Sequence, residues 1–336
     1  MNLLCTEKNI YLKGPFSALP ERVISNQDIL DWMKSSQNPA LISFSTGIRT
    51  RRWVNEEQAC SDLAVLAAEK LFAAKPMEKN KINQIILATI SGDYLAPPTS
   101  PLVQHRLGLQ NTGAFDIGAA CAGFIVGLHT STALAQASTS SVLLIASEIR
   151  SKFLNKTNFA TSVLFGDGAA ACIISPEKEG AEFRIIASAL FADGEVSDTV
   201  STPAGGSRLP ANQCKNPEQL YITIKENTAL FVKAVHGMVD GAKQFLKSIN
   251  LSTADIQWLV PHQGNKNLIL SVAKQLGFFE DRLIKTVEET GNTSGASVGI
   301  ALDYLRINAN IKAEDKVLLV AAGGGGIAAC ALLEVI

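Results

Sequence analysis

The chain has 336 residues, of which 47% are hydrophobic, and its 30 basic and 31 acidic side chains give a formal net charge of −1. This length and composition allow a large buried core and two or three domains of ordinary size. The balanced charge gives no support for binding to nucleic acid or to an anionic membrane surface, because both favour a strong excess of basic residues.

Strand-like apolar runs alternate with helical periodicity along the whole chain, which is typical of a layered α/β protein. The predicted strands are, in chain order, Ile85–Thr89, Ala114–Ile117, Val142–Ala146, Ala169–Ile174, Ile256–Val260 and Val317–Ala321. The predicted helices are Ser61–Ala74, Phe124–Ala137, Tyr221–Ile249 and Leu268–Leu276. No long linker and no low-complexity segment interrupts this pattern.

Two predicted strands of the first half have counterparts in the second half. IILATISGD at 85–93 resembles WLVPHQGN at 258–265, and VLLIASE at 142–148 resembles VLLVAAG at 317–323. The two matches have almost the same offset along the chain, which favours a duplicated α/β unit over a chance likeness of apolar strands. We therefore expect an N-terminal half, 1–180, and a C-terminal half, 181–336, with a site where their strand ends meet.

The segment Val317–Ile336 carries almost no charge and is long enough for a membrane helix. Four glycines, Gly323–Gly326, lie in its middle, and glycine disfavours a helix. We interpret it as two buried strands joined by a glycine turn, and we predict no membrane span. The six cysteines form no CxxC pair and no signal-peptide stretch precedes them, so we expect reduced thiols in the cytoplasm and no metal site.

Cys121 is a candidate nucleophile in the segment FDIGAACAGFIVGLHTSTALA. The strand Ala114–Ile117 leads there through small residues into an apolar helix. A cysteine in the first turn of a buried helix meets the positive end of the helix dipole, which favours the thiolate, and the thiolate is the nucleophile. The local residues also allow the alternative of a packed core cysteine, which is the usual fate of a free thiol.

Two polar segments of the second half supply further candidates. His262 ends a predicted strand in WLVPHQGNKN and could exchange a proton near neutral pH, or it could be a capping or surface histidine. Asn292 lies in EETGNTSGASVG, where its role could be capping or donation to a thioester oxygen that becomes an enolate. The backbone N–H groups of the Gly323–Gly326 turn could bind a developing oxyanion.

Taken in order, these segments resemble β-ketoacyl-acyl-carrier-protein synthase III. TGIRTRRW at 46–53, DIGAACAGF, LFGDGAAA at 164–171, LVPHQGN, GNTSGAS and GGGG are similar to the motifs of that family over nearly the whole chain. The resemblance implies a five-layer αβαβα thiolase fold with two duplicated halves, and a homodimer. It also implies a catalytic triad of Cys121, His262 and Asn292.

The resemblance further implies two half-reactions. Cys121 would attack an acyl thioester while the backbone N–H groups of Cys121 and Gly324 hold the oxyanion. A second thioester, normally malonyl on acyl carrier protein, would then lose carbon dioxide, and His262 and Asn292 would stabilise its enolate during the Claisen condensation. Acyl carrier protein is the implied partner, and no metal or redox cofactor is implied.

Several positions depart from family members that are primed by acetyl-CoA. Where those enzymes carry a tryptophan and two arginines for the CoA nucleotide, this chain has Leu41, Ser45 and Phe159. The bulky gate of the acyl pocket, which the partner subunit supplies in the family, corresponds to Ala96, with Leu95 and Phe124 as the expected neighbours. We therefore expect a donor longer than acetyl.

The docking arginine for the carrier protein also differs, because Asn267 takes its position. Lys266 and Lys274 are the expected sources of positive charge for an acidic carrier protein. These departures fit a specialised ketosynthase for a secondary metabolite, such as a dialkylresorcinol-type enzyme that joins two longer acyl thioesters.

Three other classes of protein share part of this pattern. A degradative thiolase needs a second catalytic cysteine, but Cys330 lies beyond the glycines in a different context. A type III polyketide synthase has a GFGPG segment where this chain has GGGGIA. A non-catalytic partner subunit of a heterodimeric ketosynthase would be marked by loss of the triad, and all three residues are present here.

Overall fold

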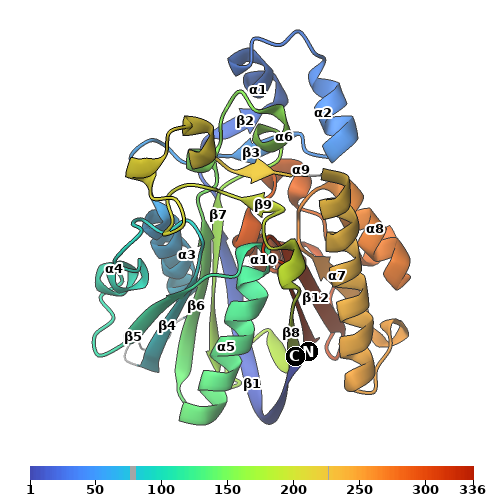
Figure 1. Cartoon of the computed structure of the whole chain (residues 1–336). Helices are drawn as coiled ribbons and strands as arrows, with labels where there is room; N and C mark the ends of the chain where they lie inside the picture. The colour runs from blue at the N-terminus through green and yellow to red at the C-terminus, as the bar shows by residue number, and fades with distance from the viewer. Residues whose placement is uncertain (76–80, 226) are drawn as a thin grey trace.

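The computed structural model of the protein describes residues 1–75, 81–225 and 227–336, and it is built around one mixed β-sheet (Figure 1). Nine strands lie in the order β11-β12-β13-β8-β1-β7-β6-β4-β5. Their bounds are β1 Asn2–Ala18, β4 Ile82–Ala88, β5 Gly113–Ile117, β6 Ser141–Glu148, β7 Gly168–Ser175, β8 Phe183–Ala192, β11 Trp258–Pro261, β12 Lys316–Gly323 and β13 Ile327–Val335. Two small ribbons, β2 Val23–Ser25 with β3 Thr50–Arg52 and β9 Val200–Ser201 with β10 Thr223–Ile224, lie outside this sheet.

The helices divide into a central pair, outer helices and a set of further short helices. The central pair is α5 Gly123–Ser138 and α10 Ser297–Asn308. The outer helices are α3 Cys60–Ala74, α4 Ser100–Arg106, α7 Asn227–Ser248 and α8 Lys266–Leu276. The short helices are α1 Asn26–Trp32, α2 Pro39–Thr46, α6 Phe159–Ser162 and α9 Val287–Thr290.

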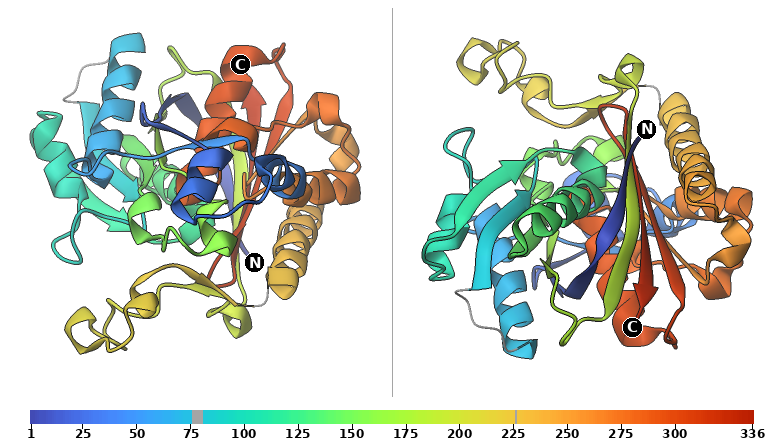
Figure 2. Two further views of the ribbon diagram at one scale, coloured as in Figure 1. Left: turned by 90° about the horizontal axis from the view of Figure 1, so that it is seen from above. Right: turned by 90° about the horizontal axis from the view of Figure 1, so that it is seen from below.

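These elements stack in five layers, which confirms the predicted thiolase fold. Helix α3 packs on β1, β6 and β7, whereas α7 packs on β8, β12 and β13. Helices α5 and α10 contact strands of both halves and each other, so they form the middle layer (Figures 1 and 2). The two sheets of the αβαβα arrangement are joined at one side, because β1 pairs antiparallel with β8.

The strand pairing repeats between the halves. β4 runs parallel to β6, and β6 runs antiparallel to β7. In the same way β11 runs parallel to β12, and β12 runs antiparallel to β13. The pairs that resemble each other in sequence, β4 with β11 and β6 with β12, therefore occupy equivalent places, as the predicted duplication requires.

The turns that lead into α5 and α10 are also equivalent. Each contains a non-glycine residue in the left-handed region, Ala120 with φ +44° and Ser294 with φ +49°. The turns touch, since a Cβ atom added to Gly123 would lie 3.3 Å from the Cα atom of Gly295. Two pseudo-equivalent turns therefore meet back to back in the middle layer.

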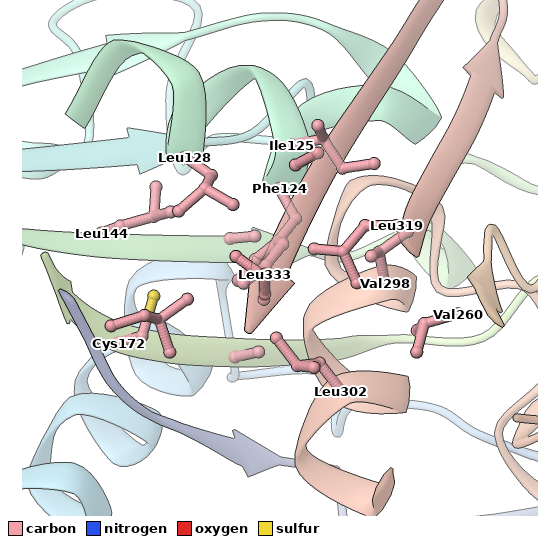
Figure 3. Close-up of a cluster of buried hydrophobic side chains, with 14 of the residues drawn as sticks. Phe124, Ile125, Leu128, Leu144, Cys172, Val260, Val298, Leu302, Leu319 and Leu333 are labelled. Carbon is pink, nitrogen blue, oxygen red and sulfur yellow. The ribbon is translucent and has the colours of Figure 1, made fainter. Parts of the chain in front are cut away.

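The two halves share one hydrophobic core. Buried side chains of both halves pack around α5 and α10 in one cluster, in which Figure 3 labels Leu128, Leu144, Val298 and Leu302. Strand β7 ends at Ser175 and β8 begins at Phe183, on either side of residue 180. Each half also has a cluster made almost wholly of its own residues, so the division into 1–180 and 181–336 stays a prediction about the unit that was duplicated.

Most predicted elements are present, with one long helix shortened. The apolar segment Val317–Ile336 forms the hairpin of β12 and β13, and no helix among the described residues is long and apolar enough to cross a membrane. The helix predicted from Tyr221 begins only at Asn227, because Thr223 and Ile224 pair with Val200 and Ser201. Residue 226, inside the predicted helix, lies outside the described residues.

Candidate active site

Cys121 lies in a short 3-10 helix, Ala120–Ala122, between β5 and α5. The helix proper starts at Gly123, so the cysteine stands just before the N-terminus of α5 rather than within its first turn. The glycine turn after β12 closes over it, because a Cβ atom on Gly323 would come within 2.8 Å of the Cys121 backbone nitrogen. Glycine is therefore required at position 323 for this approach of the two backbones.

The surroundings of the Cys121 thiol oppose ionisation on balance. Burial raises the pKa of Cys121 above its ordinary value, and Ser294, Arg150 and the Gly324 backbone N–H offset part of that rise. The Ser294 hydroxyl lies 3.9 Å from the Cys121 Sγ atom. This corrects the prediction that the thiolate is favoured in the free enzyme, because loss of hydration at the cavity floor outweighs the nearby donors.

His262 directly follows β11 and is 3% exposed. Its backbone N–H donates to the Val320 carbonyl at 2.8 Å, and its Nδ1 atom lies 2.7 Å from the Ser297 Oγ atom. Burial lowers the pKa of His262 to about 4. The imidazole is therefore neutral at physiological pH and carries one hydrogen, on either Nδ1 or Nε2.

Asn292 is held between α9 and the turn into α10. Its backbone N–H donates to the Leu164 carbonyl at 2.8 Å, and its carbonyl accepts from Gly166 at 3.0 Å. The Oδ1 atom accepts the Ser294 backbone N–H at 2.8 Å. Because Oδ1 is engaged, the amide is oriented and its Nδ2 group is left as a donor that forms no hydrogen bond within the described part of the chain.

The three residues of the predicted triad line one cavity. Cys121, His262 and Asn292 border a space of about 1090 Å³ together with Gly323–Gly326. Gly324 follows Gly323, which packs against the Cys121 backbone nitrogen, so the two predicted oxyanion donors lie on the same side of the cavity. The arrangement offers a nucleophile, a pair of backbone donors and two neutral side-chain donors around one space.

Of the predicted pocket residues, none lines this cavity in the single chain. Phe124 is fully buried in the core near Leu333 and Val298 (Figure 3), because α5 turns this side chain towards the middle layer. Placing Phe124 in the acyl pocket is therefore wrong. Leu95 is 91% exposed and Ala96 is also exposed, on the loop after β4.

The positions that replace the CoA-binding residues are divided between the cavity and the surface. Phe159 lines the cavity, whereas Leu41 is 58% exposed on α2. The Ser45 hydroxyl donates to the Ile42 carbonyl of its own helix.

Of the two lysines predicted to dock the carrier protein, Lys274 is exposed on α8. Lys266, at the start of that helix, is partly buried, and its side-chain carbons pack where Gly47 leaves space.

Arg150 lines the cavity and was not among the residues predicted from the sequence. It lies two residues after Glu148, which is the last residue of β6, and it is 7% exposed. The sequence signal is two charged residues at the carboxyl end of an otherwise apolar strand, where sites of α/β proteins are commonly built.

Comparison with known proteins gives one consistent family. The family description "3-Oxoacyl-[acyl-carrier-protein (ACP)] synthase III" matches residues 115–194, and its C-terminal counterpart matches residues 246–335. The chain is 39% identical to a β-ketoacyl-[acyl-carrier-protein] synthase III of Chlamydia muridarum, over 93% of this chain and 95% of that protein. It is 37% identical to a 3-oxopimeloyl-[acyl-carrier-protein] synthase of Rhodothermus marinus, over 88% and 85%.

A solved structure gives the same result. The 3-oxoacyl-(acyl carrier protein) synthase III of Pseudomonas aeruginosa PAO1 superposes with a TM-score of 0.88 at 30% identity, over 97% of this chain and 98% of that one. The likeness therefore covers nearly the whole of both chains. By its fold, its cavity and these relatives, the chain belongs to the β-ketoacyl-acyl-carrier-protein synthase III family of condensing acyltransferases.

Proposed function

We propose that the enzyme transfers an acyl group to Cys121 and then condenses it with malonyl on acyl carrier protein. The Cys121 Sγ atom forms a bond to the thioester carbon, the carbon–sulfur bond to the carrier breaks, and the thiol proton leaves with the carrier thiol. The backbone N–H groups of Cys121 and Gly324 hold the oxygen of the tetrahedral intermediate. The observation that carries this proposal is the single cavity shared by Cys121, His262 and Asn292.

The second half-reaction depends on two neutral donors. When Ser297 donates its hydroxyl hydrogen to Nδ1 of His262, the remaining imidazole hydrogen is on Nε2, on the side of the ring away from Ser297. Together with Nδ2 of Asn292, it binds the thioester oxygen of the malonyl group as carbon dioxide leaves and the enolate forms. The enolate carbon then attacks the acyl carbon, and the bond from that carbon to Sγ breaks.

The partners follow from this chemistry. Acyl thioesters need no metal or redox cofactor for either half-reaction, and Lys274 offers exposed positive charge for an acidic carrier protein.

A second copy of the chain would pair along β5, which ends the sheet and contacts only β4 within it. The exposed side chains of Tyr94 and Leu95 lie on the loop between these strands and would be covered there. The six unpaired cysteines suit a cytoplasmic enzyme.

The experiment compares acyl loading with condensation in His262→Ala and Asn292→Ala. Each variant should load Cys121 at close to the normal rate but condense about 10²–10³-fold more slowly, because each lacks one donor to the enolate oxygen. Intact-mass spectrometry measures loading, and product formation from preloaded enzyme measures condensation. If loading collapses while preloaded enzyme still condenses, the assigned roles are wrong.

A second candidate concerns the donor group. The Rhodothermus marinus relative is named for a 3-oxopimeloyl product, which carries a carboxylate at the end remote from the thioester. Arg150, buried against this cavity, favours a product of that kind over the unsubstituted longer chain that the departures in the sequence predict. Loading rates measured with donors that have or lack a terminal carboxylate distinguish these two kinds of donor.

A further inference from the structure

The guanidinium group of Arg150 contacts two aromatic rings but forms no hydrogen bond or ion pair within the described residues. The residue lines the cavity beside Cys121, is 7% exposed, and its Nε atom is buried without a hydrogen bond. Within residues 1–75, 81–225 and 227–336 it forms no ion pair. The group lies 5.8 Å from the ring centroid of Phe165 and 5.9 Å from that of Phe153. A cationic group is thus surrounded by aromatic rings at the wall of a substrate cavity.

The buried carboxylates next to Arg150 form no ion pair with its guanidinium, although Glu148 interacts with it electrostatically, and both accept hydrogen bonds from other donors. Glu148 accepts the Ser91 hydroxyl at 2.5 Å and the Ser294 hydroxyl at 3.5 Å. Asp167 accepts the backbone N–H groups of Arg150 at 2.7 Å and of Ser151 at 2.8 Å. The guanidinium therefore remains available to an anion that enters the cavity.

We propose that Arg150 binds the terminal carboxylate of the acyl donor, so that the donor is the thioester of a short dicarboxylic acid. This inference rests on the acyl-transfer function proposed above. A guanidinium offers a planar pair of N–H donors that matches a carboxylate, and a carboxylate also neutralises a charge that is otherwise buried and unpaired. An unsubstituted alkyl chain in the same place leaves that charge uncompensated.

The carboxylate of the malonyl partner is a poorer occupant. An ion pair with Arg150 would stabilise the carboxylate that has to leave as carbon dioxide, and stabilising a ground state slows the step that consumes it. The terminal carboxylate of the donor survives the reaction, so the same ion pair holds it without opposing chemistry. The position also restricts length, because Arg150 and Cys121 line the same cavity and the acyl chain has to span the space between them. We expect succinyl, glutaryl or adipyl donors rather than long ones.

The experiment measures kcat/KM for loading of the full-length enzyme with glutaryl-CoA, pentanoyl-CoA and the methyl ester of glutaryl-CoA. The three donors share a five-carbon acyl chain, but only glutaryl carries a terminal charge. Glutaryl should exceed pentanoyl by about 10²-fold, as expected of a hydrogen-bonded pair of charged groups. The ester should resemble pentanoyl. Succinyl-CoA and adipyl-CoA, measured alongside, locate the optimal length.

The variants are Arg150→Met, which keeps the apolar stem, and Arg150→Lys, which keeps the charge. Arg150→Met should lose the preference for glutaryl over pentanoyl, and Arg150→Lys should keep part of it. The exposed Arg282 provides the control, since Arg282→Met removes an equal charge that does not line the cavity. A general effect of Arg150 on the thiol would change both donors equally and leave their ratio unmoved.

The outcomes separate the two proposals. Equal loading of glutaryl and its methyl ester, or a ratio that Arg150→Met does not change, overturns the carboxylate site while leaving acyl transfer intact. Absence of covalent loading from every donor, with Cys121 present and the protein folded, overturns the proposed function itself.

Discussion

The chemistry of Cys121 depends on loss of hydration more than on its place before a helix. Because burial raises the pKa of the thiol, we expect the free enzyme to hold it protonated at pH 7 and the loading rate to rise with pH, by up to tenfold per unit below that pKa. Cys121→Ala should abolish the mass increase on incubation with a donor thioester. Cys214→Ala, whose sulfur does not border the cavity, is the matched control and should load normally.

The second prediction at this scale concerns His262 and pH. The histidine is neutral in the fold with a pKa of about 4, whereas in the unfolded chain it titrates near 6.5. Between these values the unfolded state binds more protons, so the free energy of unfolding falls as the pH is lowered from 6.5 towards 4, by about 3 kcal/mol in total.

This pH dependence is measured by urea unfolding at several pH values for the wild type and His262→Asn. The slope over pH 4–6.5 should be smaller in the variant, because asparagine does not titrate. Equal slopes in the two proteins would show that His262 is not desolvated in the fold.

Individual residues were predictable to different degrees. The shared cavity of Cys121, His262 and Asn292 could be predicted because each lies in a distinctive segment, after a strand for Cys121 and His262 and between two helices for Asn292, and family resemblance connected them. Phe124 was misplaced because α5 is apolar on nearly every face, and sequence alone does not say which face meets the cavity. Arg150 was missed because one charged residue after a strand is ordinary until its burial and lack of a partner are known.

At the scale of elements, the contact between α5 and α10 positions the site. Gly299 of α10 packs directly on the neighbouring layer, since a Cβ atom there would lie 2.7 Å from both Ala170 and Phe124. Gly299→Ala should therefore lower the free energy of unfolding by about 1–3 kcal/mol. Displacement of α10 also moves Ser297, which contacts His262.

Thermal unfolding together with the condensation assay tests this contact. Gly194→Ala is the matched control, because an added Cβ atom there meets nothing within 4 Å. We expect the Gly299 variant to lose condensation more than loading. Unchanged melting of Gly299→Ala would contradict the packing of the middle layer described above.

Elements in the core were predictable from periodicity, whereas their ends were not. Apolar runs located β4, β6, β7 and β12, because a strand buried on both faces reads as a continuous hydrophobic stretch. The start of α7 was placed too early because Thr223 and Ile224 continue its apolar pattern. Their pairing with β9 is a long-range contact that no local pattern reports.

At the scale of the whole molecule, the free edge of β5 predicts association of two copies. Light scattering at micromolar concentration should give the mass of a dimer. Leu95→Asp should shift the mass towards the monomer, because Leu95 is 91% exposed on the loop between β4 and α4 and a charge there disfavours burial. Phe279→Asp, at an exposed apolar residue outside the β4–β5 region, should leave the dimer intact. A wild-type monomer would contradict the proposed assembly.

The layered architecture was predictable from two kinds of evidence. Two strand segments of the first half resemble segments of the second half, and the motifs of the whole chain resemble one family. The joining of the two sheets was not predictable, since it depends on β1 of one half pairing with β8 of the other. The place of Ala96 in the acyl pocket stays a prediction, because this residue lies exposed on a surface loop and does not line the cavity of the single chain.

The back-to-back turns before α5 and α10 have a consequence for how such an enzyme can evolve. Cys121 stands on one turn, Asn292 leads into the other, and Gly123 and Gly295 leave no room between them. Neither turn can gain a side chain at its glycine unless the other retreats. We therefore expect tolerated changes at this meeting point to arise in pairs, one in each turn.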